Sequence, residues 1–186
     1  SFLSSIHLYI CGYLFYYFFI NKEISIKNNI FELALYGAFG LCFLALFLNF
    51  FTSLNKTINN LLFFFPIIFF LIFYFNKHFL KKAFKYSLPI AILFLITISY
   101  DNSYRPDAGS YHLPYISILN ENKILIGINN IHYRFGHTSI MQYLSAIYNN
   151  NIFNEAGVTI PLCLIFCNFV GYLIFEIFNK KNPKPA

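Results

Sequence analysis

Long apolar runs alternate with short polar connectors along most of the chain. The runs cover Phe2–Ile20, Phe31–Phe51, Ile58–Phe75, Phe84–Tyr100 and Ala156–Phe178. Each is close to the roughly 20 residues that an α-helix needs to cross a bilayer. The pattern therefore predicts five transmembrane helices. Pro66 and Pro89 fall inside two of them, where a proline bends a membrane helix without ending it.

One long polar segment, Asp101–Glu155, separates the fourth run from the fifth. Within it, Ser110 is placed to cap an amphipathic helix over Tyr111–Asn120. Ser139 and Gln142 have the spacing of a capping box, which predicts a second helix over Ser139–Ile147. Helices too short to span usually lie in the interface plane. The predicted fold class is an all-α integral membrane protein, with about five transmembrane helices plus two short interfacial helices in a long outer loop.

Composition agrees with this class. The chain is 58% hydrophobic and 11% charged, and its mean hydropathy is +0.59, whereas a soluble domain carries about a quarter charged residues. Lysines gather in connectors 21–30 and 76–85 and in tail 179–186, which the positive-inside rule assigns to the cytoplasm. Residues 51–57 and 101–155 are then expected outside. Because the basic residues flank spans and form no groove-sized patch, the expected partners are membrane lipids and no nucleic acid.

This reading divides the chain into four transmembrane helices over 1–100, the outer loop over 101–155, a fifth helix over 156–178 and a cytoplasmic tail. The chain opens inside an apolar run and its single methionine is Met141, so it is interpreted as a fragment of a longer protein. Four cysteines lie in the predicted spans without a disulfide or zinc pattern. Cys163 and Cys167, with Asn168 and Gly171 nearby, predict a helix-packing surface.

Every Asp and Arg of the chain lies in the polar segment. They are Asp101, Arg105, Asp107 and Arg134. A carboxylate at headgroup depth can act as a general base, and guanidinium groups bind phosphate bidentately. This combination suits chemistry on a lipid-linked phosphate, with Asp107 and Asp101 as catalytic candidates and Arg134 and Arg105 as substrate-binding candidates. A structural alternative is that Asp107 turns the chain and pairs with Arg105, while Arg134 anchors to lipid headgroups.

Three histidines of the same segment, His112, His132 and His137, are further substrate-binding candidates. Together with Asp107 they can also supply a zinc or manganese shell, although no pair has the i, i+4 spacing of a metalloprotease helix. The competing interpretation is hydrogen-bonded interface histidines beside tyrosines. No cofactor is predicted from these residues.

About fifty residues of the polar segment resemble the first outer loop of uncharacterised bacterial multi-spanning proteins that are similar to the GT-C glycosyltransferase superfamily. The matching stretches are Asp107–Tyr115, Ile118–Asn122, Gly127–His132, Arg134–Gly136 and Leu144–Ala146. The resemblance implies sugar transfer from a polyprenyl-phosphate donor at the outer face of a bacterial inner (plasma) membrane. It matches Asp107 to the acidic catalytic position, makes Asp101 the second candidate and leaves a divalent ion held by acidic residues open.

The chain departs from the superfamily pattern in two respects. Asp101 and Asp107 are separated by five residues instead of forming a paired motif, and four spans precede the loop instead of one. His112, His132 and Arg134 have no residue-level match, so their proposed roles rest on chemistry alone. Two other classes remain as alternatives: a transporter or flippase of a lipid-linked or small polar substrate, and a noncatalytic membrane scaffold. A transporter places ionisable groups near the bilayer midplane, where Asn168 and the prolines stand out in this sequence.

Overall fold

The structure is a computed structural model that describes residues 1–20, 29–100, 108–136 and 139–180. Its α-helices are α1 (Phe2–Phe19), α2 (Ile30–Asn49), α3 (Lys56–Phe73), α4 (Lys77–Tyr100), α5 (Leu113–Glu121), α6 (Ile140–Tyr148) and α7 (Ile160–Lys180). A π-helix, η1 (Ala108–His112), precedes α5, and short 3-10 helices follow at η2 (Ile128–Asn130), η3 (Tyr133–Gly136) and η4 (Asn154–Thr159). Helices α1 to α4 and α7 are long and apolar enough to cross a membrane, so the prediction of five spans is confirmed.

The fourth span begins earlier than expected, at Lys77 rather than Phe84. The side chain of Asn76 accepts a hydrogen bond of 3.0 Å from the Phe79 amide and so caps the helix. The lysines assigned to a connector therefore lie on the first turns of α4, where their long side chains can reach the membrane surface. Pro66 and Pro89 lie inside continuous helices, as expected.

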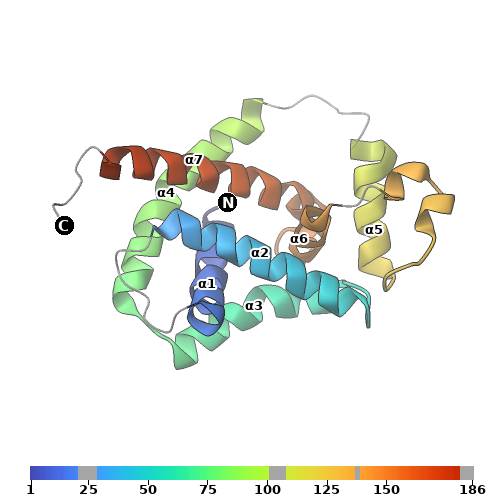
Figure 1. Cartoon of the computed structure of the whole chain (residues 1–186), viewed down its shortest axis with the longest axis horizontal. Helices are drawn as coiled ribbons and strands as arrows, with labels where there is room; N and C mark the ends of the chain where they lie inside the picture. Colours follow the sequence, from blue (N-terminus) through green and yellow to red (C-terminus); the bar gives the residue numbers. More distant parts are fainter. Residues whose placement is uncertain (21–28, 101–107, 137–138, 181–186) are drawn as a thin grey trace.

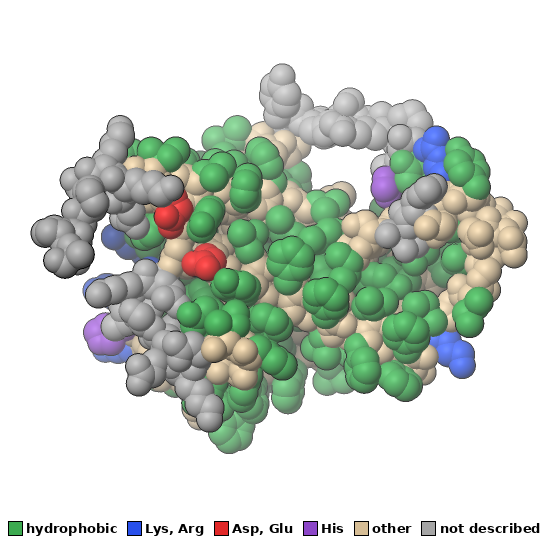
Figure 2. Space-filling view, in the orientation of Figure 1, with side chains coloured by type: hydrophobic (Ala, Val, Ile, Leu, Met, Phe, Trp, Pro, Cys, Tyr) green, Lys and Arg blue, Asp and Glu red, His purple; other side chains and the backbone are tan. Residues whose placement is uncertain are grey.

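Helices α1 and α2 form the centre of the bundle. In α1 61% of the residues are buried and in α2 50%, against 22–33% in α3, α4 and α7. Two glycines allow this close crossing, because a Cβ at Gly37 would collide with the Leu8 carbonyl and one at Gly12 with the Leu33 carbonyl. Hydrophobic side chains cover most of the face in Figure 2, while charged ones gather toward its left and right ends. The outer helices therefore supply the lipid-facing surface.

The polar connectors meet at two opposite ends of the bundle. We call one the loop end: residues 50–55 lie against the segment 113–124, with the Leu54 amide donating to the Leu119 carbonyl and the Ile124 amide to the Asn49 carbonyl, both at 2.9 Å. We call the other the lysine end: it comprises the start of α2, the start of α4 and the end of α7, with Asn29 Nδ2 donating to Glu176 Oε1 at 3.3 Å. Figure 1 shows α5 at the right and the end of α7 at the left. The start of α4 and the end of α7 thus lie at the same end of the bundle, as the distribution of lysines in the sequence predicts.

Protein, rather than lipid, covers the apolar face of α6. All residues of Tyr143–Tyr148 are buried, and the helix packs against α2, α3, α5 and α7. The small side chains of Ser145 and Ala146 allow neighbouring helices to pack closely against α6. The predicted capping box of Ser139 and Gln142 is present at its start. Helix α5 likewise buries Tyr115, Ile116 and Leu119.

An asparagine network joins the segments of the loop end. Asn59 Nδ2 donates to the carbonyls of Leu54 (2.8 Å) and Asn149 (3.0 Å). Asn120 Nδ2 donates to the Leu54 carbonyl at 2.7 Å, and Asn149 Nδ2 donates to Asn120 Oδ1 at 2.8 Å. Because amides both donate and accept, these side chains satisfy backbone groups that helix ends leave unpaired. The network fixes α5 and α6 on the spans.

The sidedness of the two ends can be tested by labelling single cysteines. Asn130 and Lys81 are both exposed and belong to the loop end and the lysine end. In intact cells, a membrane-impermeant maleimide is expected to label Asn130→Cys, and to label Lys81→Cys only after permeabilisation. The unsubstituted chain is the control, because its four cysteines lie in the spans. The reverse labelling would place the loop end in the cytoplasm.

Candidate functional site

Three of the predicted site residues, His112, His132 and Arg134, are described by the structure. The other candidates, Asp101, Arg105, Asp107 and His137, lie outside the described residues. The site is therefore built from the segment that begins at Ala108, the residue directly after Asp107 in the sequence.

That segment opens with the π-helix η1, which runs into α5. Pro114 has no amide hydrogen to bond the Ser110 carbonyl, which fits the wider turn at this point. The expectation that Ser110 caps the helix is wrong, because Ser110 lies inside η1 and helical backbone begins at Ala108. π-Turns of this kind are frequent at functional sites.

Arg134 lies close to two tyrosine rings. Its Cζ is 4.6 Å from the centroid of Tyr111 and 5.7 Å from that of Tyr133, and its Nε donates to the Tyr133 hydroxyl at 2.9 Å. Across from it, His112 Nδ1 and Gln142 Nε2 are 3.3 Å apart. We call these five residues the arginine cluster. It brings η1, η3 and the start of α6 together around a half-buried cation.

His132 packs next to the arginine cluster. Its ring stacks on Tyr133 with centroids 5.1 Å apart and lies 5.3 Å from the ring of Phe135. Its Nδ1 accepts a hydrogen bond of 3.3 Å from the Arg134 amide. His132 therefore shapes the turn that presents Arg134. Within the described part of the chain, no three His, Cys, Asp or Glu side chains gather as metal ligands would.

A cavity of about 660 Å³ opens on the other side of the η1–α5 segment. We call it the loop-end cavity, and it lies between η1, α5, η4 and the ends of α3 and α6. Its lining residues are Asn55, Lys56, Gly109, Leu113, Pro114, Ile116, Ser117, Asn120, Glu121, Asn149, Glu155 and Val158. The sequence analysis missed Lys56, Glu121 and Glu155, which come from three separate segments. In the sequence, these three residues stand out only as charged residues beside a span or at the end of an amphipathic helix.

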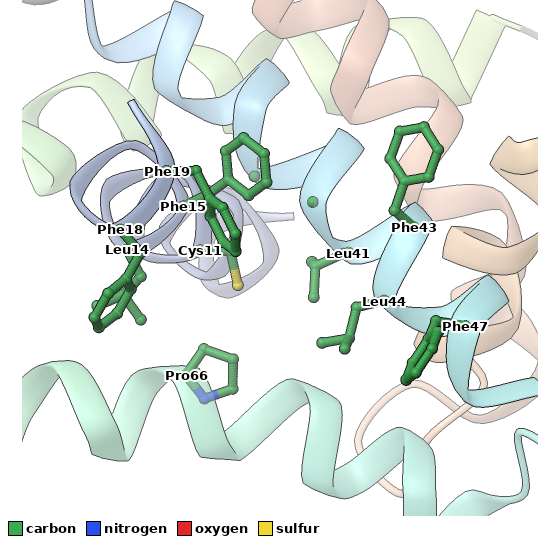
Figure 3. A pocket seen from close by; sticks show the side chains of 12 residues that line it. Cys11, Leu14, Phe15, Phe18, Phe19, Leu41, Phe43, Leu44, Phe47 and Pro66 are labelled. Carbon is green, nitrogen blue, oxygen red and sulfur yellow. The ribbon is translucent and has the colours of Figure 1, made fainter. Parts of the chain in front are cut away.

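An apolar groove of about 470 Å³ lies within the spans α1, α2 and α3. Figure 3 shows aromatic and aliphatic side chains around it, with Pro66 of α3 facing Leu14 of α1 and Leu44 of α2. Its lining includes exposed rings such as Phe18 and Phe43. Such a surface suits hydrocarbon chains and provides no group for phosphate or proton chemistry.

A buried histidine that the sequence analysis missed lies in α1, toward the loop end. The His7 ring stacks on Phe63 with centroids 4.3 Å apart. Its Nε2 lies 3.4 Å from the Leu62 carbonyl oxygen and 3.3 Å from Cys11 Sγ, and its Nδ1 lies 3.1 Å from the Tyr148 hydroxyl. Burial raises the pKa of Tyr148 well above its ordinary value, so this hydroxyl remains a donor. His7 thus joins α1, α3 and α6.

The cysteines of α7 face α4, as predicted for a packing surface. Cys167 Sγ lies 3.9 Å from Thr97 Oγ1, and Cys163 Sγ lies 4.0 Å from the Phe94 carbonyl. All four cysteines of the chain are free thiols. Asn168, on the same helix, accepts a hydrogen bond of 3.0 Å from the Tyr9 hydroxyl. These groups hold helices together.

Comparison with known proteins gives a family. A family model described as "Domain of unknown function (DUF8201)" matches residues 2–185. The search of curated proteins found no match. The search of solved structures found none either.

Proposed function

The chain belongs to the DUF8201 family, a domain of unknown function, and we propose that it is a membrane glycosyltransferase-like protein. It transfers a sugar from a polyprenyl-phosphate donor at the loop end, as the resemblance of residues 107–146 to the GT-C superfamily implies. The observation that carries this proposal is the arginine cluster, which fixes Arg134 beside the helix segment that directly follows Asp107.

In this proposal, Arg134 binds the donor phosphate. A guanidinium pairs with phosphate oxygens through a planar fork, and the contacts of Arg134 with Tyr111 and Tyr133 restrict its position before the substrate arrives. The position at an end of the spans also suits a lipid-linked donor, whose phosphate lies at the membrane surface while its chain lies among lipids. Arg105, His112 and His137 are the remaining candidates for contacts with the same phosphate.

Asp107 is the proposed general base, and Asp101 is the second candidate. The carboxylate takes the proton of the acceptor hydroxyl while the acceptor oxygen bonds to the anomeric carbon of the donor sugar. The bond from that carbon to the phosphate oxygen breaks, and polyprenyl phosphate leaves with the electron pair. Arg134 offsets the charge that develops on the phosphate, so the two groups act at opposite ends of one displacement.

Transport is less well supported than transfer. The polar groups inside the spans, His7 and Asn168, are paired with Tyr148 and Tyr9 from neighbouring helices. A substrate path across the membrane needs polar groups that face a water-filled cavity. The apolar groove of α1, α2 and α3, and a second pocket of about 400 Å³ lined by residues of α2, α4 and α7, have linings of almost entirely aliphatic and aromatic residues.

The proposal is tested by measuring sugar transfer from polyprenyl-phosphate sugars to membrane acceptors by the full chain. Arg134→Ala is expected to raise the KM for the donor about 10- to 100-fold, because it removes charged hydrogen bonds to phosphate. The donor KM of Arg134→Lys is expected to lie between those of the unsubstituted chain and Arg134→Ala, because lysine keeps the charge but loses the planar fork of the guanidinium.

Lys123→Ala is the matched control, because it removes an exposed loop-end cation outside the arginine cluster. An unchanged donor KM in Arg134→Ala would remove Arg134 from donor binding. Failure of the unsubstituted chain to transfer from any polyprenyl-phosphate sugar would contradict the function itself and favour the transporter or scaffold alternatives.

A further inference from the structure

The loop-end cavity has a lining unlike that of a phosphate site. Among the residues that the structure describes, its lining contains one cation, Lys56, and two carboxylates, Glu121 and Glu155. The excess of carboxylates repels anions. Its remaining polar groups are mainly amides, and Leu113, Pro114 and Val158 supply apolar surface. About 660 Å³ lies within the usual range of small-molecule sites, roughly 300–1,000 Å³.

The cavity wall also presents acceptors that call for hydrogen-bond donors. The side chains of Glu121 and Glu155 are exposed and line the cavity. Glu121 is held at the wall by the Ser117 hydroxyl, which donates to its Oε1 at 3.1 Å. On the opposite side, Lys56 Nζ donates to Asn154 Oδ1 at 3.3 Å, so the one cation is partly engaged.

We propose that the loop-end cavity binds an uncharged polyhydroxylated group, a sugar unit of the acceptor, and not the donor phosphate. Sugar hydroxyls donate to the carboxylates of Glu121 and Glu155. The C–H face of the ring packs on Leu113 and Pro114. The identification of this sugar as the acceptor rests on the proposed transferase function. Sugar binding itself can be measured without transfer.

The two sites lie on different faces of one helical segment. Gly109, Leu113 and Asn120 line the cavity, whereas Tyr111 and His112 contact the arginine cluster. This spacing separates the residues by about half a helical turn. Donor and acceptor therefore reach the η1–α5 segment from two sides, and Asp107 precedes both faces in the sequence.

The test is ligand binding to the full chain in lipid nanodiscs, measured by saturation-transfer NMR and titration. The probes are two neutral disaccharides, N,N′-diacetylchitobiose and maltose, and one anionic sugar, glucose 6-phosphate. At least one neutral disaccharide is expected to bind, and glucose 6-phosphate is expected not to. In the double variant Glu121→Gln and Glu155→Gln, the neutral sugar should bind about tenfold more weakly, and glucose 6-phosphate should gain binding.

Lys123→Ala is again the control, and both glutamates are exposed, so thermal unfolding should show an intact fold. The proposal is overturned if neither disaccharide binds, if glucose 6-phosphate binds better to the unsubstituted chain, or if the double variant leaves all affinities unchanged. Sugar binding without any transfer would contradict the transferase function and keep the cavity assignment. Sugar transfer that is unchanged in the double variant would contradict the cavity assignment and keep the transferase function.

Discussion

Asp107→Asn is expected to lower sugar transfer by about two to four orders of magnitude while the bundle stays folded. The substitution keeps the size and hydrogen-bonding shape of the side chain but removes the base that accepts the proton of the acceptor hydroxyl. The measurement is the rate of transfer by the full chain in membranes at saturating donor and acceptor. A fall in kcat with little change in the donor KM identifies a catalytic role.

Asp101→Asn provides the comparison, because it removes the other carboxylate of the same segment. Its transfer rate is expected to stay within a few-fold of the unsubstituted rate. If Asp101→Asn shows the large loss and Asp107→Asn does not, the two assignments exchange. Equal activity in both variants would leave the segment without a general base and would support the structural alternative, in which Asp107 only turns the chain.

Gly37→Ala is expected to lower the free energy of unfolding by about 1–3 kcal/mol. A Cβ at this position would collide with the Leu8 carbonyl and lie 2.7 Å from the Gly12 amide nitrogen. Both contacts are backbone, so α1 and α2 would have to move apart. The measurement is denaturant unfolding in detergent micelles, followed by circular dichroism.

The matched control is Gly40→Ala, one turn further along the same helix. Its added Cβ would meet only the ring of Phe15, with the nearest carbon at 2.7 Å, and that side chain can rotate away. Both substitutions gain similar helix propensity, so the difference between them isolates the helix crossing. Equal stability of the two variants would show that α1 and α2 do not pack through Gly37.

Most of the fold followed from the sequence because each span is a local signal. Apolar run length predicts a membrane helix wherever the helix later packs, and Ser139 and Gln142 define a helix start within four residues. The start of α4 was misplaced because lysines suggested a connector, whereas the cap at Asn76 draws them into the helix. The burial of α6 depends on which helices surround it, and no period in its sequence carries that information.

The candidate site was predictable only in part for a similar reason. The gathering of Asp and Arg pointed to the segment that holds Arg134, and His112 was named there as a substrate-binding candidate, whereas Tyr111 was not. The loop-end cavity combines Lys56, Glu121 and Glu155, which are far apart along the chain. Likewise, asparagines such as Asn149 look like turn formers in the sequence, yet they join distant segments at the loop end.

The position of His7 has a consequence for how the protein is made. Two of its partners, the Leu62 carbonyl and the Tyr148 hydroxyl, follow it by 55 and 141 residues, whereas Cys11 Sγ, 3.3 Å from Nε2, lies on the same helix. Of these three contacts, helix α1 therefore carries only the one with Cys11 when it is synthesised. The full set is complete only once Tyr148 of α6 has been made, after α1, α2, α3 and α4.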